Sequence, residues 1–232
     1  MKKKMFRKQY EGYLYVAPWI FGFTVLTLIP FICLIYFSFT KYNMLSAPEW
    51  IGIHNYTEIF NGDEKFLTSL KVTFIYVLVS VPLKLIAALL VAMLLNQKRR
   101  GIGIYRTLFY IPSIIGGSVA VAVMWRNLFS RDGAFNALIE AITGIHMDIS
   151  WVADPSTALG SLILMAIWQF GSPMLIFLAG LKNISSTYYE AARMDGANKV
   201  QCFFSITLPL LSPIIFFNLI MQMINGFMTF TQ

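Results

Sequence analysis

Residues 188–209 read YYEAARMDGANKVQCFFSITLP and form a short polar stretch between two long apolar segments. Thr187 stands three residues before Glu190, a spacing typical of a capping box at the start of a helix. Gly196 suits the left-handed position that ends such a helix, and Asn198 is a favoured cap for the next one. The stretch therefore predicts a helical elbow. We interpret this elbow as the part of the chain that another protein grips from outside the bilayer.

The elbow also carries a spaced set of residues that resembles a known family. The set reads EAA, three residues, G, nine residues, I, one residue, LP, and begins at Glu190. It is similar at every position to the EAA loop of the permeases of binding-protein-dependent ABC importers. The resemblance implies that residues 182–209 seat a coupling helix in a groove of a cytoplasmic ATP-binding subunit, where Glu190 makes a polar contact. The residues expected to couple the chain to that ATPase are Glu190, Ala191, Ala192, Asp195, Gly196, Leu208 and Pro209.

A simpler interpretation of the elbow stays open. Thr187 and Glu190 would then only cap a helix, and Gly196 would only end it. The two roles are compatible. The side chains of Ala191 and Ala192 are short, so another protein could approach this face of the first helix closely.

The composition places the chain in a bilayer. Hydrophobic residues make up 57% of the 232 residues and charged residues only 12%, which is too apolar for a soluble domain of this size. The net charge of +7 does not indicate nucleic acid, because the basic residues sit in short runs between apolar segments. Cys33 and Cys202 fall on opposite sides of the expected topology, so no disulfide is expected.

Five apolar stretches are each long enough, or nearly so, to cross the hydrocarbon layer as a helix. The first is an uncleaved span that tolerates two internal prolines. The five are residues 14–39, the interval between Lys71 and Lys98, residues 107–125, the interval between Asp154 and Lys182, and the segment from the end of the elbow almost to Gln232. The sequence therefore predicts an all-α, polytopic membrane helix bundle.

The charged loops predict the orientation of these spans. Residues 1–8, 96–106 and 182–205 hold twelve lysines and arginines and only two acids. The two loops that alternate with them hold, with their flanks, five basic residues and eight acids. Because basic loops stay in the cytoplasm, we expect the amino terminus and the elbow inside and residues 41–65 and 130–154 outside. In the outer loop an amphipathic run, 134–142, ends near Gly144 and is expected to lie along the interface with Trp151 as an anchor, although a plain loop helix packed on the bundle fits equally well.

The resemblance extends over nearly the whole chain and favours the carbohydrate-uptake branch of these permeases. It rests on APWIFGFTVLTLIPFICLIYFSFTKYN (17–43), WIGIHNYTEIF (50–60) and FYIPSIIGGSVAVAVMWRNLFSRDGAFNALI (109–139). It implies a type I ABC importer permease fold of six spans, of which this chain holds five and lacks the last. The implied divisions are residues 1–65, with the first span and an external loop, and residues 66–232, a truncated type-1 transmembrane domain.

Polar residues at membrane depth mark a candidate translocation path. Lys84 is a charge near the middle of the second span, which costs about 2.5–3.5 kcal/mol at a helix centre, so it should face a water-filled cavity or other helices. Asn218, Gln222 and Asn225 share one helical face. With Gln169, and with Trp168 and Phe227 nearby, they would supply amides for hydroxyl groups and rings for sugar faces. A misjudged span edge or local pairing for Lys84, and interhelical hydrogen bonds for the amides, are the open alternatives.

Motifs for catalysis are missing from the sequence. It has no Walker-type glycine loop and no HExxH motif, and His54 and His146 stand alone in different loops. We expect no enzyme activity, cofactor or metal in this chain. By resemblance its partners are a second permease, two ATP-binding subunits, an external solute-binding protein, a sugar-like solute and membrane lipids, without nucleic acid. The competing interpretation is an ion-coupled secondary transporter; a membrane-embedded enzyme would need intramembrane acids or histidines that the sequence does not offer.

Overall fold

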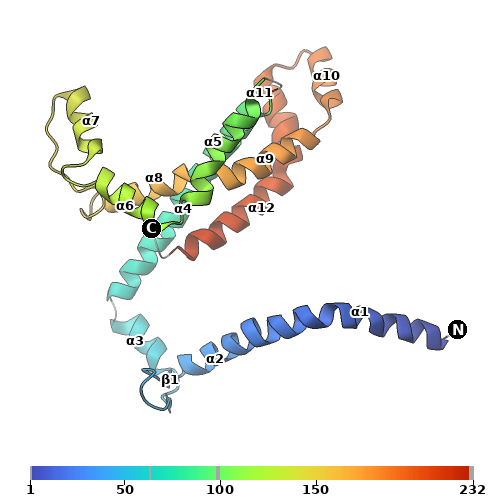
Figure 1. Cartoon of the computed structure of the whole chain (residues 1–232), viewed down its shortest axis with the longest axis vertical. Coiled ribbons are helices and arrows are strands. Elements are labelled where there is room, and N and C mark those ends of the chain that lie inside the picture. Colours follow the sequence, from blue (N-terminus) through green and yellow to red (C-terminus); the bar gives the residue numbers. More distant parts are fainter. Residues whose placement is uncertain (1, 63, 98–99, 230–232) are drawn as a thin grey trace. The chain divides into compact units, whose positions relative to one another are not determined.

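The computed structural model describes residues 2–62, 64–97 and 100–229, and most of these are helical (Figure 1). The chain divides into two compact units, Met1–Ser69 and Leu70–Gln232, which are described separately. Residues 98 and 230–232, at the ends of the second and fifth predicted spans, lie outside the described residues, as does residue 1.

The first unit opens with one continuous helix made of α1 (Lys2–Phe23), the π-helical turn η1 (Thr24–Leu28) and α2 (Ile29–Ser38). The π turn ends two residues before Pro30, whose ring nitrogen cannot donate a hydrogen bond to the preceding turn. The Ile29 N–H, just before the proline, donates to the Thr24 carbonyl, five residues back. Residues Gly12–Ser38 are long and apolar enough to cross a membrane. The first predicted span is therefore confirmed as a helix of sufficient length.

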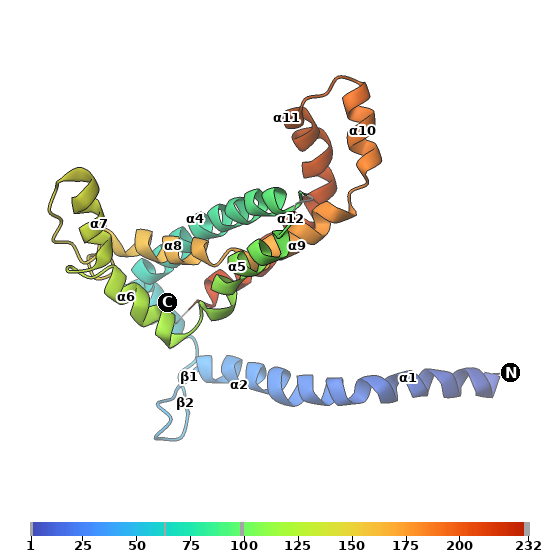
Figure 2. The same ribbon diagram turned by 45° about the horizontal axis from the view of Figure 1, so that its top comes forward.

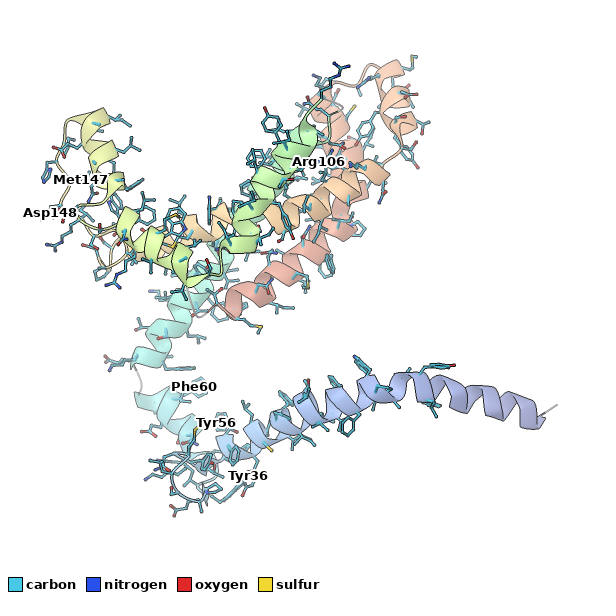
Figure 3. The ribbon with its side chains drawn as sticks, in the orientation of Figure 1. Tyr36, Tyr56, Phe60, Arg106, Met147 and Asp148 are labelled. Carbon is cyan, nitrogen blue, oxygen red and sulfur yellow. The ribbon has the colours of Figure 1, made fainter. Side chains whose placement is uncertain are left out.

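A small hairpin and a short helix follow this span. Strands β1 (Thr40–Lys41) and β2 (Glu49–Trp50) pair antiparallel, and α3 (His54–Gly62) comes next. The Asn55 amide donates to the Ser38 and Thr40 carbonyls at 2.9 and 3.0 Å, which satisfies the end of α2. Figure 3 labels Tyr36, Tyr56 and Phe60, aromatic residues contributed by the two helices that flank the hairpin. Residues 40–62, which include most of the predicted polar loop, thus contain a hairpin and a short helix.

The second unit contains the remaining helices. They are α4 (Glu64–Leu95, which begins before the boundary), α5 (Ile102–Ile115), α6 (Val119–Leu128), α7 (Ala134–Thr143), α8 (Ala158–Trp168), α9 (Gly171–Asn183), α10 (Ser186–Met194), α11 (Lys199–Cys202), the π turn η2 (Phe203–Thr207) and α12 (Leu208–Phe227). Figure 2 shows α10 and α11 at one end of this unit and α7 at the other.

The core of the second unit forms around α9, which packs against α5 and α12 (Figure 1). Met174 and Phe177 of α9 are almost fully buried in a cluster that also includes Leu211 of α12. From α4, residues at helical spacing turn inward: Val77, Val81, Leu85, Ala88, Ala92 and Leu95. A Cβ on Gly180 would collide with Ile214, so glycine at this position lets α9 and α12 approach closely. Small residues at helix contacts are typical of membrane bundles.

Two of the five predicted spans are not single helices. The structure breaks residues 107–125 into α5 and α6, which meet at an angle of 97°. The break falls at Gly116 and Gly117, where helix propensity is low, and at Ser118, whose hydroxyl accepts from the Val121 N–H and starts α6. Helices α8 and α9 bend by 42°. Among the described residues three helices are long enough to span a membrane, and the predicted number of five is reached if each bent pair is one span.

Residues 130–154, which include α7 and are called the α7 segment below, are held together by hydrogen bonds. α7 ends at Gly144 with φ of +70°, as the sequence predicts. The buried Asn136 amide donates to the Arg131 and Ile149 carbonyls, both at 2.8 Å, and accepts from the Trp151 indole. Trp151 is half-buried and packs edge-on against Phe135. Its predicted role as an interface anchor stays a prediction, and the structure gives its indole an internal partner.

Candidate functional site

The first helix of the elbow begins two residues earlier than the sequence analysis predicts. The N-cap of α10 is Ser185, which has extended backbone angles and whose hydroxyl accepts from the Thr187 N–H at 3.3 Å. The capping box predicted between Thr187 and Glu190 is therefore wrong, because Thr187 already lies inside the helix. This leaves the Glu190 side chain exposed on α10 and free of a capping role.

The end of α10 agrees with the prediction. Gly196 has φ of +83°, and the Ala197 N–H donates to the Ala192 carbonyl at 2.8 Å while the Gly196 N–H donates to the Arg193 carbonyl at 3.1 Å. These two bonds are the pair expected of a Schellman motif. Asn198 then caps α11, as predicted, and the Gln201 side chain returns the bond to the Asn198 N–H at 2.7 Å. The sequence analysis overlooked Gln201, although the N-x-x-Q spacing signals a capping box.

One side-chain hydrogen bond connects the first helix of the elbow, α10, to the π turn η2 in the long helix that ends the described chain. The Tyr189 hydroxyl lies 2.9 Å from the buried Thr207 hydroxyl, which connects α10 to η2. Both side chains line a cavity of about 360 Å³, together with Arg193, Lys199 and Cys202 among others. This hydrogen bond therefore ties α10 to the π turn that leads into α12.

The predicted coupling residues fall into two groups. Exposed on α10 and at its end are Glu190, Ala191, Asp195 and Gly196, with Ala192 half-buried beside them. Leu208 and Pro209 instead lie inside the continuous helix 199–227, where η2 passes into α12. Leu208 is half-buried, and its N–H donates to the Phe203 carbonyl, five residues back, just before Pro209, which has no N–H to donate. The first group offers a surface, and the second lies at the π turn within the fifth span.

Four of the five predicted path residues line a single cavity. Lys84 of α4, Gln169 after α8, and Gln222 and Asn225 of α12 surround a space of about 290 Å³. Hydroxyl groups complete much of its lining, from Tyr76, Ser80, Ser113, Ser172 and Thr229. Gln222 and Asn225 are one turn apart and face this space together, as their spacing predicts. The structure thus brings together predicted path residues that lie up to 141 positions apart in the sequence, Lys84 and Asn225.

Asn218 is not part of this cavity. It is fully buried, and neither its amide nitrogen nor its amide oxygen has a hydrogen-bond partner among the described residues. It lies one turn before Gln222, where α12 faces the packed interior. The aromatic residue expected nearby, Phe227, is exposed and packs edge-on against Phe74 of α4.

Ser113 holds Gln169 in place. Its hydroxyl donates to the Gln169 carbonyl at 2.9 Å and accepts from the Ser172 N–H at 3.1 Å, so it bridges the bend between α8 and α9. Backbone groups freed at such a bend need partners within a membrane. Gly116 has no side chain to obstruct that of Gln169, which a Cβ there would hit. The sequence analysis missed Ser113, because its partners lie 56 and 59 residues away.

A larger cavity of about 460 Å³ shares Gln169 with the first. Its lining includes Trp125 and Arg126 of α6, with Met165 of α8. The Trp125 ring stacks on Phe129 at 5.2 Å and meets Trp168 edge-on at 5.5 Å. Trp168 thus supports the cavity wall from behind, while Trp125, which the sequence analysis did not single out, forms it.

Charged groups in the α7 segment have partners of their own. His146, which the sequence shows as isolated, lies 3.0 Å from the Glu140 carboxylate, whose hydrogen bond and charge raise the pKa of His146. Asp148, labelled in Figure 3, approaches Arg131 at 3.9 Å. Asp154 accepts from the backbone and the hydroxyl of Ser156, which lowers the pKa of its carboxyl group.

Comparison with known proteins identifies the family. The family described as the binding-protein-dependent transport system inner membrane component matches residues 61–232. The probable ABC transporter permease protein YesP of Bacillus subtilis (strain 168) is 58% identical over 231 residues, which cover 99% of this chain and 74% of the relative. The lactose transport system permease protein LacF of Rhizobium radiobacter is 34% identical over 225 residues, covering 96% and 74%.

A solved structure supports the fold. A bacterial ABC transporter involved in the import of the acidic polysaccharide alginate superimposes with a TM-score of 0.79 at 24% identity, covering 94% of this chain and 74% of that one. The type I importer permease fold and the multi-pass membrane location follow from these matches and from the apolar helices. The family match and the permease relatives also exclude the competing interpretation, an ion-coupled secondary transporter. The chain belongs to the inner membrane components of binding-protein-dependent transport systems, and it is a permease subunit of an ABC importer.

Proposed function

We propose that this permease moves a sugar or sugar derivative through the two cavities that share Gln169. The observation that carries the proposal is the convergence of Gln169, Gln222 and Asn225 with several hydroxyl groups on one space. Amides both donate and accept, so they suit the hydroxyl groups of a sugar, which also do both. The Trp125 ring in the adjoining cavity offers a flat surface for a sugar face. The relative named as a lactose permease supports this substrate class.

The proposal includes the elbow as the contact for a cytoplasmic ATPase. Glu190, Ala191 and Asp195 present a compact, exposed surface on α10, and Tyr189 connects this helix to the start of α12. ATP binding and hydrolysis take place on two partner subunits and move the elbow. Through Tyr189 and Thr207 the movement reaches α12, which carries Gln222 and Asn225, so the helices switch between inward and outward access.

The remaining parts of the assembly are a second permease subunit and an external solute-binding protein that delivers the sugar. The amino terminus and the elbow lie in the cytoplasm, and the α7 segment faces outward. The twelve basic residues in the cytoplasmic segments support this orientation. Another solved alginate transporter, described in complex with a substrate-bound periplasmic protein, supports the expectation of an external receptor.

Uptake by the complete transporter tests the path. The full-length chain is reconstituted with its partners in proteoliposomes, with ATP inside and a panel of radiolabelled oligosaccharides and receptor outside. We expect Asn225→Ala and Gln222→Ala to lower uptake while receptor-stimulated ATP hydrolysis continues. Asn127→Ala, an exposed position on α6 outside both cavities, is the matched control. Unchanged uptake in both path variants, or no sugar uptake by the wild type, would refute the proposal.

A further inference from the structure

The charges that line the two cavities are all of one sign. Lys84 lines the smaller cavity and Arg126 the larger one, and none of the described residues that line either cavity is an aspartate or a glutamate. Lys84 is half-buried, and among the described residues no carboxylate pairs with it. An ammonium group that is partly withdrawn from water without a counter-charge is unfavourable. A mobile anion that enters the cavity would relieve this.

Among the described residues, no acid forms an ion pair with Lys84 or Arg126. The α7 segment adjoins the larger cavity, which Ser130 and Ser150 also line. Three of its acids have other partners: Asp148 pairs with Arg131, Glu140 with His146, and Asp154 with Ser156. Residues 130–154 hold four acids, yet the charged side chains that line the two cavities are those of Lys84 and Arg126. A cavity with low-dielectric walls and charge of one sign concentrates ions of the other.

We propose that the solute carried by this permease is an anionic sugar, whose acidic group pairs with Lys84 in the smaller cavity after passing Arg126. This inference rests on the proposed function and narrows its substrate class. The amides and hydroxyl groups around Lys84 bind the neutral part of the sugar, and the lysine selects the acidic group. A carboxylate, as in a uronide, and a phosphate ester share this chemistry, because the lysine ammonium acts on both as a compact positive charge.

The test compares a charged sugar with its neutral counterpart of the same shape. The complete transporter is placed in nanodiscs without its receptor, and the binding of trigalacturonate and of its fully methyl-esterified form is measured by saturation-transfer NMR. We expect the charged form to bind at least about tenfold more tightly, equivalent to about 1.4 kcal/mol. Lys84→Gln should remove this preference by weakening only the charged form, and Lys84→Arg should keep it. Uptake in proteoliposomes should follow the same order.

Lys71→Gln is the matched control, since Lys71 is an exposed lysine of the same helix that lines neither cavity. Glucose 6-phosphate is the third probe, and its binding in preference to trigalacturonate would support the anionic class with phosphate as the acidic group. Equal affinity for the charged and esterified forms, or equal losses for both in Lys84→Gln, would overturn the inference and leave the sugar path intact. If Lys84→Gln fails to assemble, loss of the preference in Lys84→Arg overturns it. Absence of binding and uptake for every sugar would instead refute the proposed function.

Discussion

Asn218 has an amide side chain whose surroundings do not satisfy it. It is fully buried in the second unit, and both polar atoms of its amide lack partners among the described residues. Burying a polar group without a hydrogen bond costs about 1–3 kcal/mol, whereas an apolar side chain of similar shape carries no such cost. Asn218 therefore lowers the stability of this conformation.

We expect Asn218→Leu to leave the stability unchanged or to raise it by up to about 1–3 kcal/mol. The measurement is the midpoint of thermal unfolding of the purified complex in detergent. Asn225→Leu is the control, since Asn225 lines the cavity and its replacement should lower uptake without raising the midpoint. A clear fall in the midpoint for Asn218→Leu would mean that the amide is hydrogen-bonded within the assembled transporter.

At the scale of elements, the elbow depends on a single left-handed residue. Gly196 ends α10 with φ of +83°, a conformation that costs a β-branched side chain about 1–2 kcal/mol. Gly196→Val should redirect the chain between α10 and α11 and weaken recovery of the ATPase subunit with the permease. Gly160→Val, at an open helical position of α8, should leave this recovery unchanged. Equal recovery in both variants would contradict this account of the elbow.

The bend between α8 and α9 depends on Ser113. Its hydroxyl serves both the Gln169 carbonyl and the Ser172 N–H, so Ser113→Ala leaves two backbone groups without their partner. We expect a destabilisation of about 1–3 kcal/mol and reduced uptake, because Gln169 loses its fixed position. Ser212→Ala, at an exposed position of α12, should change neither the unfolding midpoint nor uptake. Normal uptake in Ser113→Ala would show that the bend does not need this bridge.

Local signals in the sequence predicted some of these features and missed others for physical reasons. Gly196 and Asn198 were predicted correctly, because positive φ and capping are properties of the residue itself. The start of α10 was misplaced because Ser185 and Thr187 both satisfy the rules for an N-cap, and only the backbone angles choose between them.

Tertiary packing decided the rest of the site. Helical spacing predicted that Asn218, Gln222 and Asn225 share a face, but the neighbouring helices determine which of them meets the cavity. The Ser113 bridge joins residues that are 56 positions apart, and no local pattern reports such a contact. The break after α5 did have a local signal, Gly116 and Gly117 followed by the N-cap residue Ser118. The sequence analysis missed this signal because it took the uncharged stretch 107–125 as one span.

For the whole molecule, the central structural prediction is its orientation in the membrane. We expect a cysteine at Gln97 to be protected in sealed cells and a cysteine at Asn61 to react with an impermeant thiol reagent, in a background with Cys33 and Cys202 replaced by alanine. Both positions are exposed in the structure. Permeabilised cells, in which both should react, provide the control. Labelling of position 97 but not of position 61 in sealed cells would reverse the topology.

The central claim is that this permease is driven by an ATPase that engages the elbow. Glu190 is the exposed acid of α10, on the surface that we propose for the contact with that subunit, and Glu140, an exposed glutamate of α7, is its matched control. The most direct measurement is ATP-driven uptake by the full-length transporter in proteoliposomes. We expect Glu190→Ala to abolish most uptake with receptor binding unchanged, and Glu140→Ala to transport normally. Normal uptake in Glu190→Ala, or wild-type uptake that persists without ATP and follows an ion gradient, would contradict the account.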